Sequence, residues 1–211
     1  MPGFQQFAER FIHLQGQRIS FAGRPYLPPI YEAASRGNLV LRCSRQVEKS
    51  TLLANLITYL AVQSPGIRVL FVCPREEQAL TFSRDRLAPT ILRSPLITRQ
   101  LLPNTTKMPA KNAVFANHSQ VHIRSAFRSA DASRGISADV LLIDEYQDIA
   151  GGYLPVLQET LSHSTRRQIV LTGTPKWSTI IWSLRSGGRR HASGRSPVTV
   201  AVRPSGPMSG S

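Results

Sequence analysis

Apolar residues along this chain fall into short continuous runs, separated by longer stretches in which they recur at helical spacing. The clearest runs are Leu39–Leu41, Ile67–Val72 and Val140–Ile143. Runs of this kind are typical of strands that are buried on both faces of a parallel sheet. Between them, residues 50–63 and 76–87 carry helical patterns. This alternation predicts an α/β fold with a mostly parallel central sheet flanked by helices.

Weaker patterns predict the other elements. Apolar positions at helical spacing in residues 1–15 indicate an amphipathic helix. The segment Phe21–Tyr31 contains three prolines, so we expect it to run extended over the surface rather than to form a helix or a central strand. Residues 113–115 and 120–123 flank a polar turn and predict a β-hairpin. Ile169–Leu171 predicts a further strand.

Composition divides the chain into three parts. Residues 1–37 hold the amphipathic helix and the proline-rich segment, and residues 38–182 hold the α/β core. Residues 183–211 are rich in glycine, serine and arginine and have almost no apolar periodicity, which is the composition of a disordered tail. Foreign sequence, such as a read-through in a shifted reading frame, would have the same composition.

Charge narrows the classes of partner. The formal net charge is +14, and a basic surface of this kind attracts nucleic acid by releasing counterions. The excess is greatest near the end of the chain, because no acidic residue follows Glu159. A solvated or disordered tail is the alternative explanation for that basic stretch.

Other features of the composition exclude several classes of protein. At 211 residues and 41% hydrophobic content, the chain is long enough for one domain with a proper core. No apolar run has the length of a membrane span and the first residues lack a signal-peptide pattern, so we expect a soluble intracellular protein. Cys43 and Cys73 are too few for a disulfide framework or a zinc site, and we expect reduced thiols with packing roles.

Two adjacent carboxylates, Asp144 and Glu145, end the apolar run that begins at Val140. The carboxyl ends of parallel strands are where α/β sheets bind ligands. A buried strand can there deliver one acid to Mg²⁺ and a second acid to an attacking water, as phosphoryl-transfer enzymes require. Asp144 is therefore the candidate metal ligand and Glu145 the candidate general base. An acidic turn that caps the following helix is the alternative.

A candidate phosphate-binding loop, Cys43–Ser50, lies between the first predicted strand and a helix. Lys49 supplies a cation for phosphate oxygens, and the Ser50 hydroxyl is a candidate Mg²⁺ ligand. Against the usual Gly-x-x-x-x-Gly-Lys-Ser/Thr spacing, Cys43 stands at the first glycine and Glu48 at the second. A carboxylate about 4 Å from a phosphate charge costs roughly 1 to 4 kcal/mol, so a working site requires the Glu48 side chain to point away.

The loop Ser44–Ser50, the segment Leu142–Asp148 and the segment Leu171–Pro175 together resemble the ATPase domain of the large terminase subunit of tailed bacteriophages. The resemblance spans roughly residues 20–182. It implies a P-loop NTPase fold of the RecA-like (ASCE) type, with ATP and Mg²⁺ as cofactors, in which hydrolysis moves double-stranded DNA during genome packaging. It also implies portal and small-terminase partners, a homo-oligomeric ring and a place in the host cytoplasm. From its own residues, the proline-rich segment within 1–37 could pack a flat ring against an adenine and so lie on the adenine side of the site, and a simple linker is the alternative.

The resemblance also assigns roles to individual residues. The nucleotide-binding residues that it implies are Ser44, Arg45, Gln46, Lys49, Ser50 and Thr51. Those with catalytic or coupling roles are Glu145, Arg45 and Arg134, and Thr172, Gly173 and Thr174. Arg45 would contact phosphate, and Arg134 would reach the nucleotide of a neighbouring subunit. Thr172–Thr174 would couple hydrolysis to DNA movement, and Ser50 with Asp144 would hold Mg²⁺.

The departures from the family pattern leave two alternatives open. Large terminases continue into a nuclease domain with several metal-binding carboxylates, and nuclease activity is not expected here because no acid follows Glu159. A helicase-like, nucleic-acid-dependent ATPase also carries an Asp-Glu pair and a threonine-containing third motif, although this chain lacks a second ATPase-like half. A degenerate P-loop domain that binds DNA or a phage partner without turnover is the other alternative, and Glu48 favours it.

Overall fold

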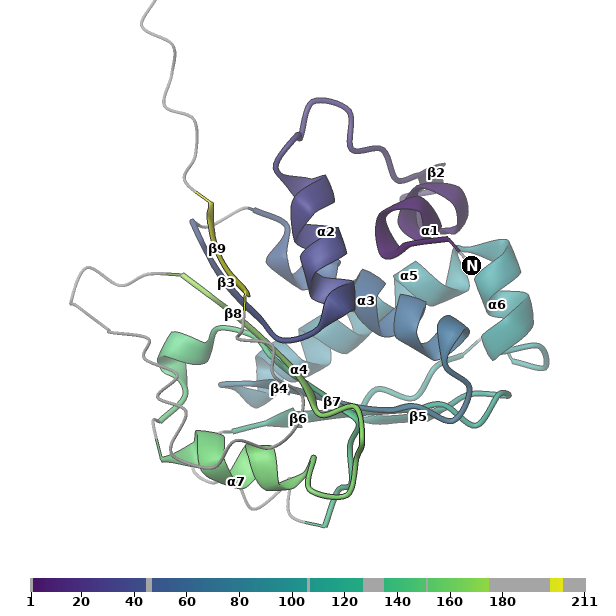
Figure 1. Cartoon of the computed structure of the whole chain (residues 1–211). Coiled ribbons are helices and arrows are strands. Elements are labelled where there is room, and N and C mark those ends of the chain that lie inside the picture. Colours follow the sequence, from purple (N-terminus) through teal and green to yellow (C-terminus); the bar gives the residue numbers. More distant parts are fainter. Residues whose placement is uncertain are drawn as a thin grey trace, which may run out of the picture.

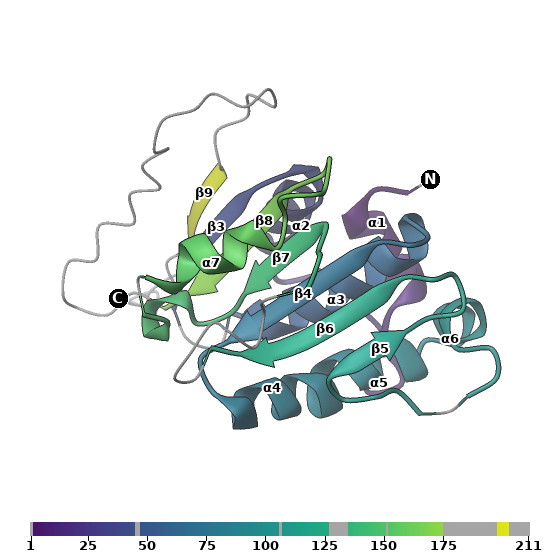
Figure 2. The same ribbon diagram turned by 90° about the horizontal axis from the view of Figure 1, so that it is seen from below.

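The computed structural model describes residues 2–44, 47–105, 107–126, 135–150 and 152–174, together with the backbone of 198–202. Within these ranges a seven-stranded sheet has the order β5-β6-β4-β7-β8-β3-β9 (Figures 1 and 2). Its strands are β3 (Leu39–Cys43), β4 (Arg68–Cys73), β5 (Asn112–Val114), β6 (Gln120–Ser125), β7 (Val140–Ile143), β8 (Gln168–Gly173) and β9 (Val198–Val202). All neighbouring strands are parallel except the hairpin β5–β6. The predicted mostly parallel sheet is confirmed.

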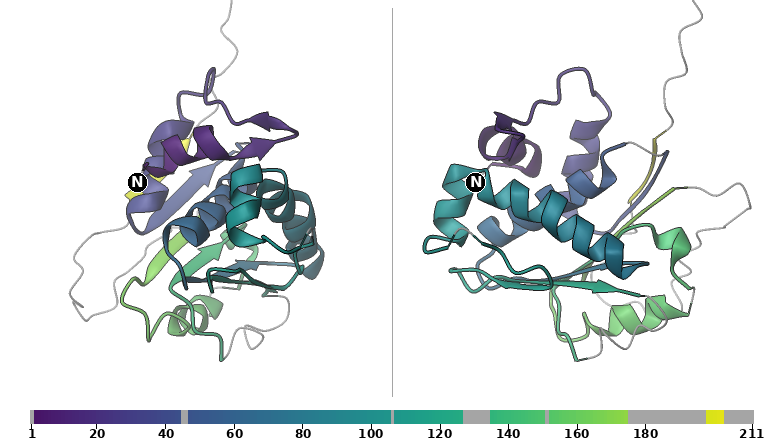
Figure 3. Two further views of the ribbon diagram at one scale, coloured as in Figure 1. Left: turned by 90° about the vertical axis from the view of Figure 1, so that its right-hand side faces the viewer. Right: turned by 180° about the vertical axis from the view of Figure 1, so that it is seen from behind.

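Helices cover both faces of this sheet (Figures 1 and 3). One face carries α1 (Phe4–Phe11), α2 (Leu27–Arg36), α3 (Lys49–Gln63), α4 (Glu76–Phe82), the π-helical turn η1 (Ser83–Leu87), α5 (Ala88–Leu92) and α6 (Pro95–Leu101). The opposite face carries α7 (Tyr153–Glu159). The short 3-10 helix η3 (Tyr146–Asp148) follows β7.

The continuous apolar runs serve both layers at once, because alternate residues of a strand point to opposite faces. On β4, Val69 and Phe71 belong to the buried cluster under α1–α6. Leu70 and Val72 belong to the cluster that contains Leu157 of α7. This is the physical reason that the central strands are apolar on nearly every residue, as the sequence predicted.

The N-terminal region differs from the sequence-based prediction. The expectation that Phe21–Tyr31 runs extended is wrong, because α2 begins at Leu27 and has Pro28 and Pro29 in its first turn. The first turn of a helix tolerates proline, since its N–H groups have no partner within the helix. Leu27, Ile30 and Tyr31 are buried, so this segment packs against the core rather than lying over the surface.

The first helix is also shorter than predicted. α1 ends at Phe11, and residues 13–18 form a small hairpin of β1 (His13–Leu14) and β2 (Gln17–Arg18). Its turn has Gln15 at φ 52° and Gly16 at φ 82°, the paired positive values of a two-residue hairpin turn. The helical spacing of the sequence therefore continued past the real end of the helix.

The helix expected at 76–87 is confirmed, and it continues through η1 into α5. The predicted strands at 39–41, 67–72, 140–143 and 169–171 and the predicted hairpin are confirmed as well. The expected tail of 183–211 is wrong at 198–202, which form β9 in parallel register with β3, with Leu41 opposite Val200. The rest of that segment lies outside the described residues.

Candidate active site

Three chain segments meet at the carboxyl edge of the sheet because β8 lies between β3 and β7. The loop after β3 leads to Lys49 and Ser50, which are the first two residues of α3. Asp144 follows β7, and Thr172 lies near the end of β8. Parallel strands place their carboxyl ends at one edge, where α/β sheets bind ligands. The structure thus brings together side chains that are up to about 120 residues apart in sequence.

Asp144 is the centre of this cluster, and only 7% of its surface is exposed. Its Oδ1 accepts hydrogen bonds from the Thr172 hydroxyl at 2.6 Å and from the Glu145 backbone N–H at 3.0 Å. Its Oδ2 accepts a hydrogen bond from the Ser50 hydroxyl at 2.9 Å. The first residue of the acidic pair is therefore tied to all three segments.

The burial of Asp144 changes its protonation. Loss of hydration raises the pKa of its carboxyl group, and the nearby Glu145 carboxylate raises it further. The hydrogen bonds from Thr172 and Ser50 oppose this shift without cancelling it. A cation beside the Asp144 carboxylate would stabilise its charged form and lower this pKa.

The oxygen atoms in the cluster suit a particular kind of metal. The described residues contain no group of three or more His, Cys, Asp or Glu side chains placed to hold a metal ion. The Ser50 hydroxyl and the Asp144 carboxylate offer two adjacent oxygen ligands. Mg²⁺ is commonly held by one or two protein oxygens, with substrate phosphates and water completing its shell. The donor set fits Mg²⁺ with a phosphate ligand and does not fit a dedicated protein metal centre.

Glu145 lies on the other side of the cluster, in a left-handed backbone conformation at φ 47°. Its Oε1 is 3.2 Å from the Nζ atom of Lys49, whose side chain is 7% exposed. Its Oε2 accepts a hydrogen bond from the side-chain amide of Gln147 at 2.5 Å. The second carboxylate is thus held between a cation and an amide.

A closed ring of polar contacts joins Glu145 to the end of β8. Lys49 donates a hydrogen bond to the Thr174 hydroxyl at 2.5 Å. The backbone N–H of Thr174 donates to the amide oxygen of Gln147 at 3.1 Å, and Gln147 returns to Glu145. A movement of any one of these four residues would change the polar contacts of at least two of the others.

Sequence reasoning missed Gln147 as a site residue. It lies on η3, directly after the acidic pair, where a three-residue helix has no periodicity that would indicate which side chain turns inward. The available signal was the amide type of the side chain two residues after Glu145, because an amide can donate to a carboxylate and accept from a backbone N–H at the same time.

Glu48 departs from the usual glycine at its position, and its backbone explains why glycine is common there. Glu48 is at φ 48° and ψ 27°, a left-handed conformation that glycine adopts without steric penalty. Its carboxylate forms an ion pair with the Arg24 guanidinium, which approaches from the N-terminal segment. The sequence did not indicate Arg24, because the two residues are 24 positions apart.

Two cavities flank the amino end of α3. One of about 370 Å³ lies beside Ser50, Asp144 and Glu145 and extends along α4 to Arg86. The other, of about 700 Å³, lies beside Glu48 and Thr51; its arginine lining is Arg24, Arg84, Arg86 and Arg93. Because Arg86 lines both, the two cavities adjoin each other across η1.

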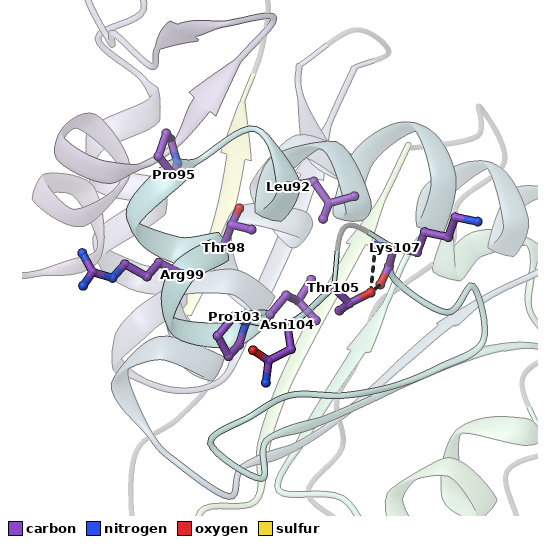
Figure 4. A pocket seen from close by; sticks show the side chains of 9 residues that line it. Leu92, Pro95, Thr98, Arg99, Pro103, Asn104, Thr105 and Lys107 are labelled. Atoms are coloured by element: carbon purple, nitrogen blue, oxygen red, sulfur yellow. Dashed lines mark hydrogen bonds between the residues drawn. The ribbon is translucent and has the colours of Figure 1, made fainter.

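A larger hollow, of about 820 Å³, lies along α5, α6 and the segment that follows α6 (Figure 4). It is lined by residues such as Leu92, Thr98 and Lys107, and none of the candidate residues contributes to it. Its size alone therefore does not make it part of the active site.

The remaining candidate residues have mixed outcomes. Ser44 is half-buried directly after β3, and Gly173 pairs in register with Arg42 of β3. Three predicted site residues, Arg45, Gln46 and Arg134, lie outside the described residues. Cys43 and Cys73 are both buried free thiols. Burial raises the pKa of Cys43 to about 11 and that of Cys73 to about 12, which favours neutral thiols.

This architecture defines a class of protein. A parallel sheet joins a lysine and a serine at the start of a helix to an acidic pair after one strand and a threonine after another. That combination of sheet edge and side chains is typical of the P-loop ATPase class. No described helix is long and apolar enough to cross a membrane.

Comparison with known families identifies the chain more closely. Residues 16–191 match the family described as "Phage terminase large subunit gpA, ATPase domain". The chain therefore belongs to this family of terminase ATPase domains, and the resemblance noted from its motifs is confirmed. The matched region extends beyond residue 182 into the segment that was expected to be a tail.

Solved structures agree on the fold. The large terminase ATPase domain of Thermus phage P74-26 has 18% identity and a TM-score of 0.56, with 81% of this chain and 78% of that chain covered. An arginine-to-alanine mutant of that domain has 19% identity and a TM-score of 0.54, with 69% of this chain but only 63% of that chain covered. A comparison with curated proteins found no match. At these identities the structures establish the fold alone.

Proposed function

We propose that this chain binds Mg-ATP at the carboxyl edge of its sheet and hydrolyses it, and that hydrolysis drives double-stranded DNA into a phage capsid. The observation that carries the proposal is the contact network among Lys49, Ser50, Asp144, Glu145 and Thr172. The residues proposed as the phosphate-binding cation, the metal ligand and the base lie together in this network, and phosphoryl transfer needs all three. Membership of the terminase ATPase family supports the same conclusion.

The nucleotide phosphates would lie at the amino end of α3. This helix has 15 residues, and its first backbone N–H groups together with the helix dipole favour an anion. Lys49 is already at this end, and a phosphate would compete with Glu145 and Thr174 for its ammonium group. Ser44 and Thr51 are also proposed to contact the phosphates, and Thr51 belongs to the first turn of α3. Arg45 and Gln46, which are proposed for the same role, lie outside the described residues.

Ser50 and Asp144 are the residues that would hold Mg²⁺. When bound, the ion would neutralise charge on the transferred phosphoryl group and on Asp144. Thr172 and the Glu145 backbone hold Oδ1 of the Asp144 carboxylate in place. The carboxylate would therefore need to move little to bind the ion through Oδ2.

Glu145 is the proposed general base. In the structure its carboxylate is paired with Lys49, and a phosphate that draws Lys49 away leaves the carboxylate to orient a water and take its proton. Gln147 holds the other carboxylate oxygen, which limits rotation of the side chain. Gln147 and Lys49 also contact Thr174. A change in the protonation of Glu145 or in the phosphate bound by Lys49 would therefore alter the contacts of Thr174, directly after β8, where coupling to DNA movement is proposed.

The larger assembly is part of the proposal. The basic composition, 26 Lys and Arg against 12 Asp and Glu, suits a partner with a phosphate backbone. By analogy with the family, the chain would form a ring, work with portal and small terminase subunits, and act in the host cytoplasm. Arg45 would contact the phosphates of its own subunit, and Arg134 would contact the nucleotide of the neighbouring subunit.

Phosphate release, measured with and without double-stranded DNA, tests the proposal. We expect Mg-dependent hydrolysis that DNA stimulates, and we expect Lys49→Ala to abolish it because Lys49 is the cation at the start of α3. Lys107→Ala, at an exposed lysine in a hollow that none of the candidate residues lines, is the matched control and should leave the rate unchanged. ATP binding without turnover would favour a degenerate binding domain, and strand separation would favour a helicase-like enzyme.

A further inference from the structure

Glu48 creates an electrostatic problem that the proposed function must solve. It directly precedes Lys49 and stands at the N-cap position of α3 without a capping hydrogen bond from its side chain, at the end of the helix where the proposed phosphates would lie. An unpaired carboxylate at about 4 Å from a phosphate charge weakens binding roughly fivefold in a water-like medium and several hundredfold at a protein surface. A nucleotide site at this helix therefore needs a cation that pairs with the Glu48 carboxylate and offsets its repulsion of the phosphates.

Arg24 is that cation in the structure. Its guanidinium pairs with the Glu48 carboxylate and also donates to the backbone oxygen of Ser20. The side chains of Arg24 and Glu48 are 34% and 32% exposed. Among the described residues, no other cation forms an ion pair with Glu48; the neighbouring Lys49 pairs with Glu145.

The segment around Arg24 is built to present this side chain. Its backbone N–H donates to the Phe21 oxygen at 2.9 Å, and its own oxygen accepts from the Leu27 N–H at 3.0 Å. Gly23 between them has a φ of +75°, which closes the turn without strain. Phe21 is buried and anchors the turn to the core.

Contacts between α2 and α3 fix this turn relative to the phosphate-binding loop. The Phe21 and Tyr31 rings meet edge to face with centroids 4.7 Å apart. The buried Tyr31 hydroxyl accepts a hydrogen bond from the Asn55 amide of α3 at 2.7 Å. The turn that carries Arg24 is thus packed, through Phe21 and Tyr31, against the helix that begins at Lys49.

We propose that Arg24 is a positioning residue for nucleotide binding, which holds the Glu48 carboxylate away from the phosphates and neutralises it. This inference rests on the proposed function. It accounts for a P-loop that carries a glutamate in place of its second glycine, and it gives the N-terminal segment a part in ATP affinity without requiring that Arg24 touch the nucleotide.

Equilibrium binding of a fluorescent ATP analogue with Mg²⁺ to the full chain tests the inference. We expect Arg24→Ala to weaken binding about tenfold or more, because it leaves the Glu48 charge unpaired. The double variant Arg24→Ala/Glu48→Gln should return affinity to within about threefold of wild type, because neither charge remains. The loss in Arg24→Ala should shrink as salt rises, since the screening length falls to about 3 Å at 1 M.

Two variants separate this role from a structural one. Arg36→Ala removes an arginine from an exposed ion pair with Glu32 on α2 and should bind the analogue as wild type does. Arg24→Lys keeps the charge and should retain most of the affinity. A thermal unfolding curve for each variant accompanies the titrations. Arg24→Ala and its double variant both lack the arginine, so a difference in affinity between them comes from the Glu48 charge alone.

The outcomes are distinguishable. Wild-type affinity in Arg24→Ala, or equal weakness of Arg24→Ala and its double variant, would overturn the role of Arg24 and leave the proposed ATPase intact. A folded wild-type chain that binds no ATP would instead overturn the proposed function and this inference with it.

Discussion

Replacing Asp144 with asparagine should stabilise the nucleotide-free protein while it removes binding of Mg-ATP. Asp144 is nearly buried, and its burial raises the pKa of the carboxyl group. Asparagine has the same shape and keeps an oxygen for the hydrogen bonds from Thr172 and the Glu145 backbone. The Ser50 hydroxyl, which now donates to Oδ2, can rotate to accept from the new amide.

The size of the effect follows from proton linkage. Below the unfolded-state pKa of about 3.9, both states hold the proton and ionisation contributes no difference. As pH rises through the higher native pKa of Asp144, the folded state binds more protons than the unfolded state, so the free energy of unfolding falls. Each unit by which the native pKa exceeds the unfolded one removes ~1.4 kcal/mol, or about 3–6 °C in melting temperature for a chain of this size. The Asp144→Asn variant would avoid that loss, because its amide does not titrate.

Thermal unfolding in the presence of a metal chelator, at pH 4 and at pH 8, measures this effect, because the loss begins at the unfolded-state pKa. We expect the advantage of Asp144→Asn over wild type to grow from the lower to the higher pH. With Mg-ATP at about a hundred times its dissociation constant, wild type should gain ~2.7 kcal/mol and the variant little, so the order reverses. Asp85→Asn, at an exposed position on η1, controls for the loss of one carboxylate.

The reasoning would be refuted if Asp144→Asn were destabilised relative to wild type by the same amount at both pH values. That result would mean that the Asp144 carboxylate is well stabilised in the empty site and that its burial has no energetic consequence. A variant that still gained full stability from Mg-ATP would remove Asp144 from the proposed metal site.

Two further predictions concern the same cluster, and a third concerns Arg134, which lies outside the described residues. Glu145→Gln should retain ATP binding and lower kcat about 10²- to 10⁴-fold, because the amide cannot take a proton; an unchanged kcat would exclude Glu145 as the base. Gln147→Ala should lower kcat with little change in KM and weaken stimulation by DNA, because it breaks the link to Thr174; a change in KM alone would contradict this role. Arg134→Ala should bind ATP but turn over about 10³- to 10⁵-fold more slowly. Mixing it with Glu145→Gln protein should restore part of the activity, and no rescue at any ratio would argue against a role in the neighbouring subunit.

The central fold and much of the cluster could be predicted from the sequence. The run Val140–Ile143 is apolar on every residue. A run of this length and composition favours a strand that is covered on both faces of a sheet. The acids that end it therefore had to lie at the edge of the sheet. The helix that begins at Lys49 was equally clear, because fifteen residues of helix-favouring sequence leave little competition from other structures.

The N-terminal region shows where local patterns stop being informative. Three prolines between Phe21 and Tyr31 indicated an extended segment, whereas α2 begins among them. Local propensity disfavours helix there by only a small amount when the prolines fall in the first turn. The burial of Leu27 and Ile30 against α1 and α3 favours the helix, and that contribution depends on partners elsewhere in the chain.

The contacts that distinguish this site were decided by tertiary structure alone. Lys49 and Thr174 are 125 positions apart, Ser50 and Asp144 are 94 apart, and Arg24 reaches Glu48 across 24. No period or motif encodes such pairs, because their distances are set by the order of strands in the sheet and by how α2 packs on α3. The sequence by itself determined which segments carry the chemistry; the packing of the sheet and its helices decided which side chains meet, since hydrogen bonds and ion pairs act only over a few ångströms.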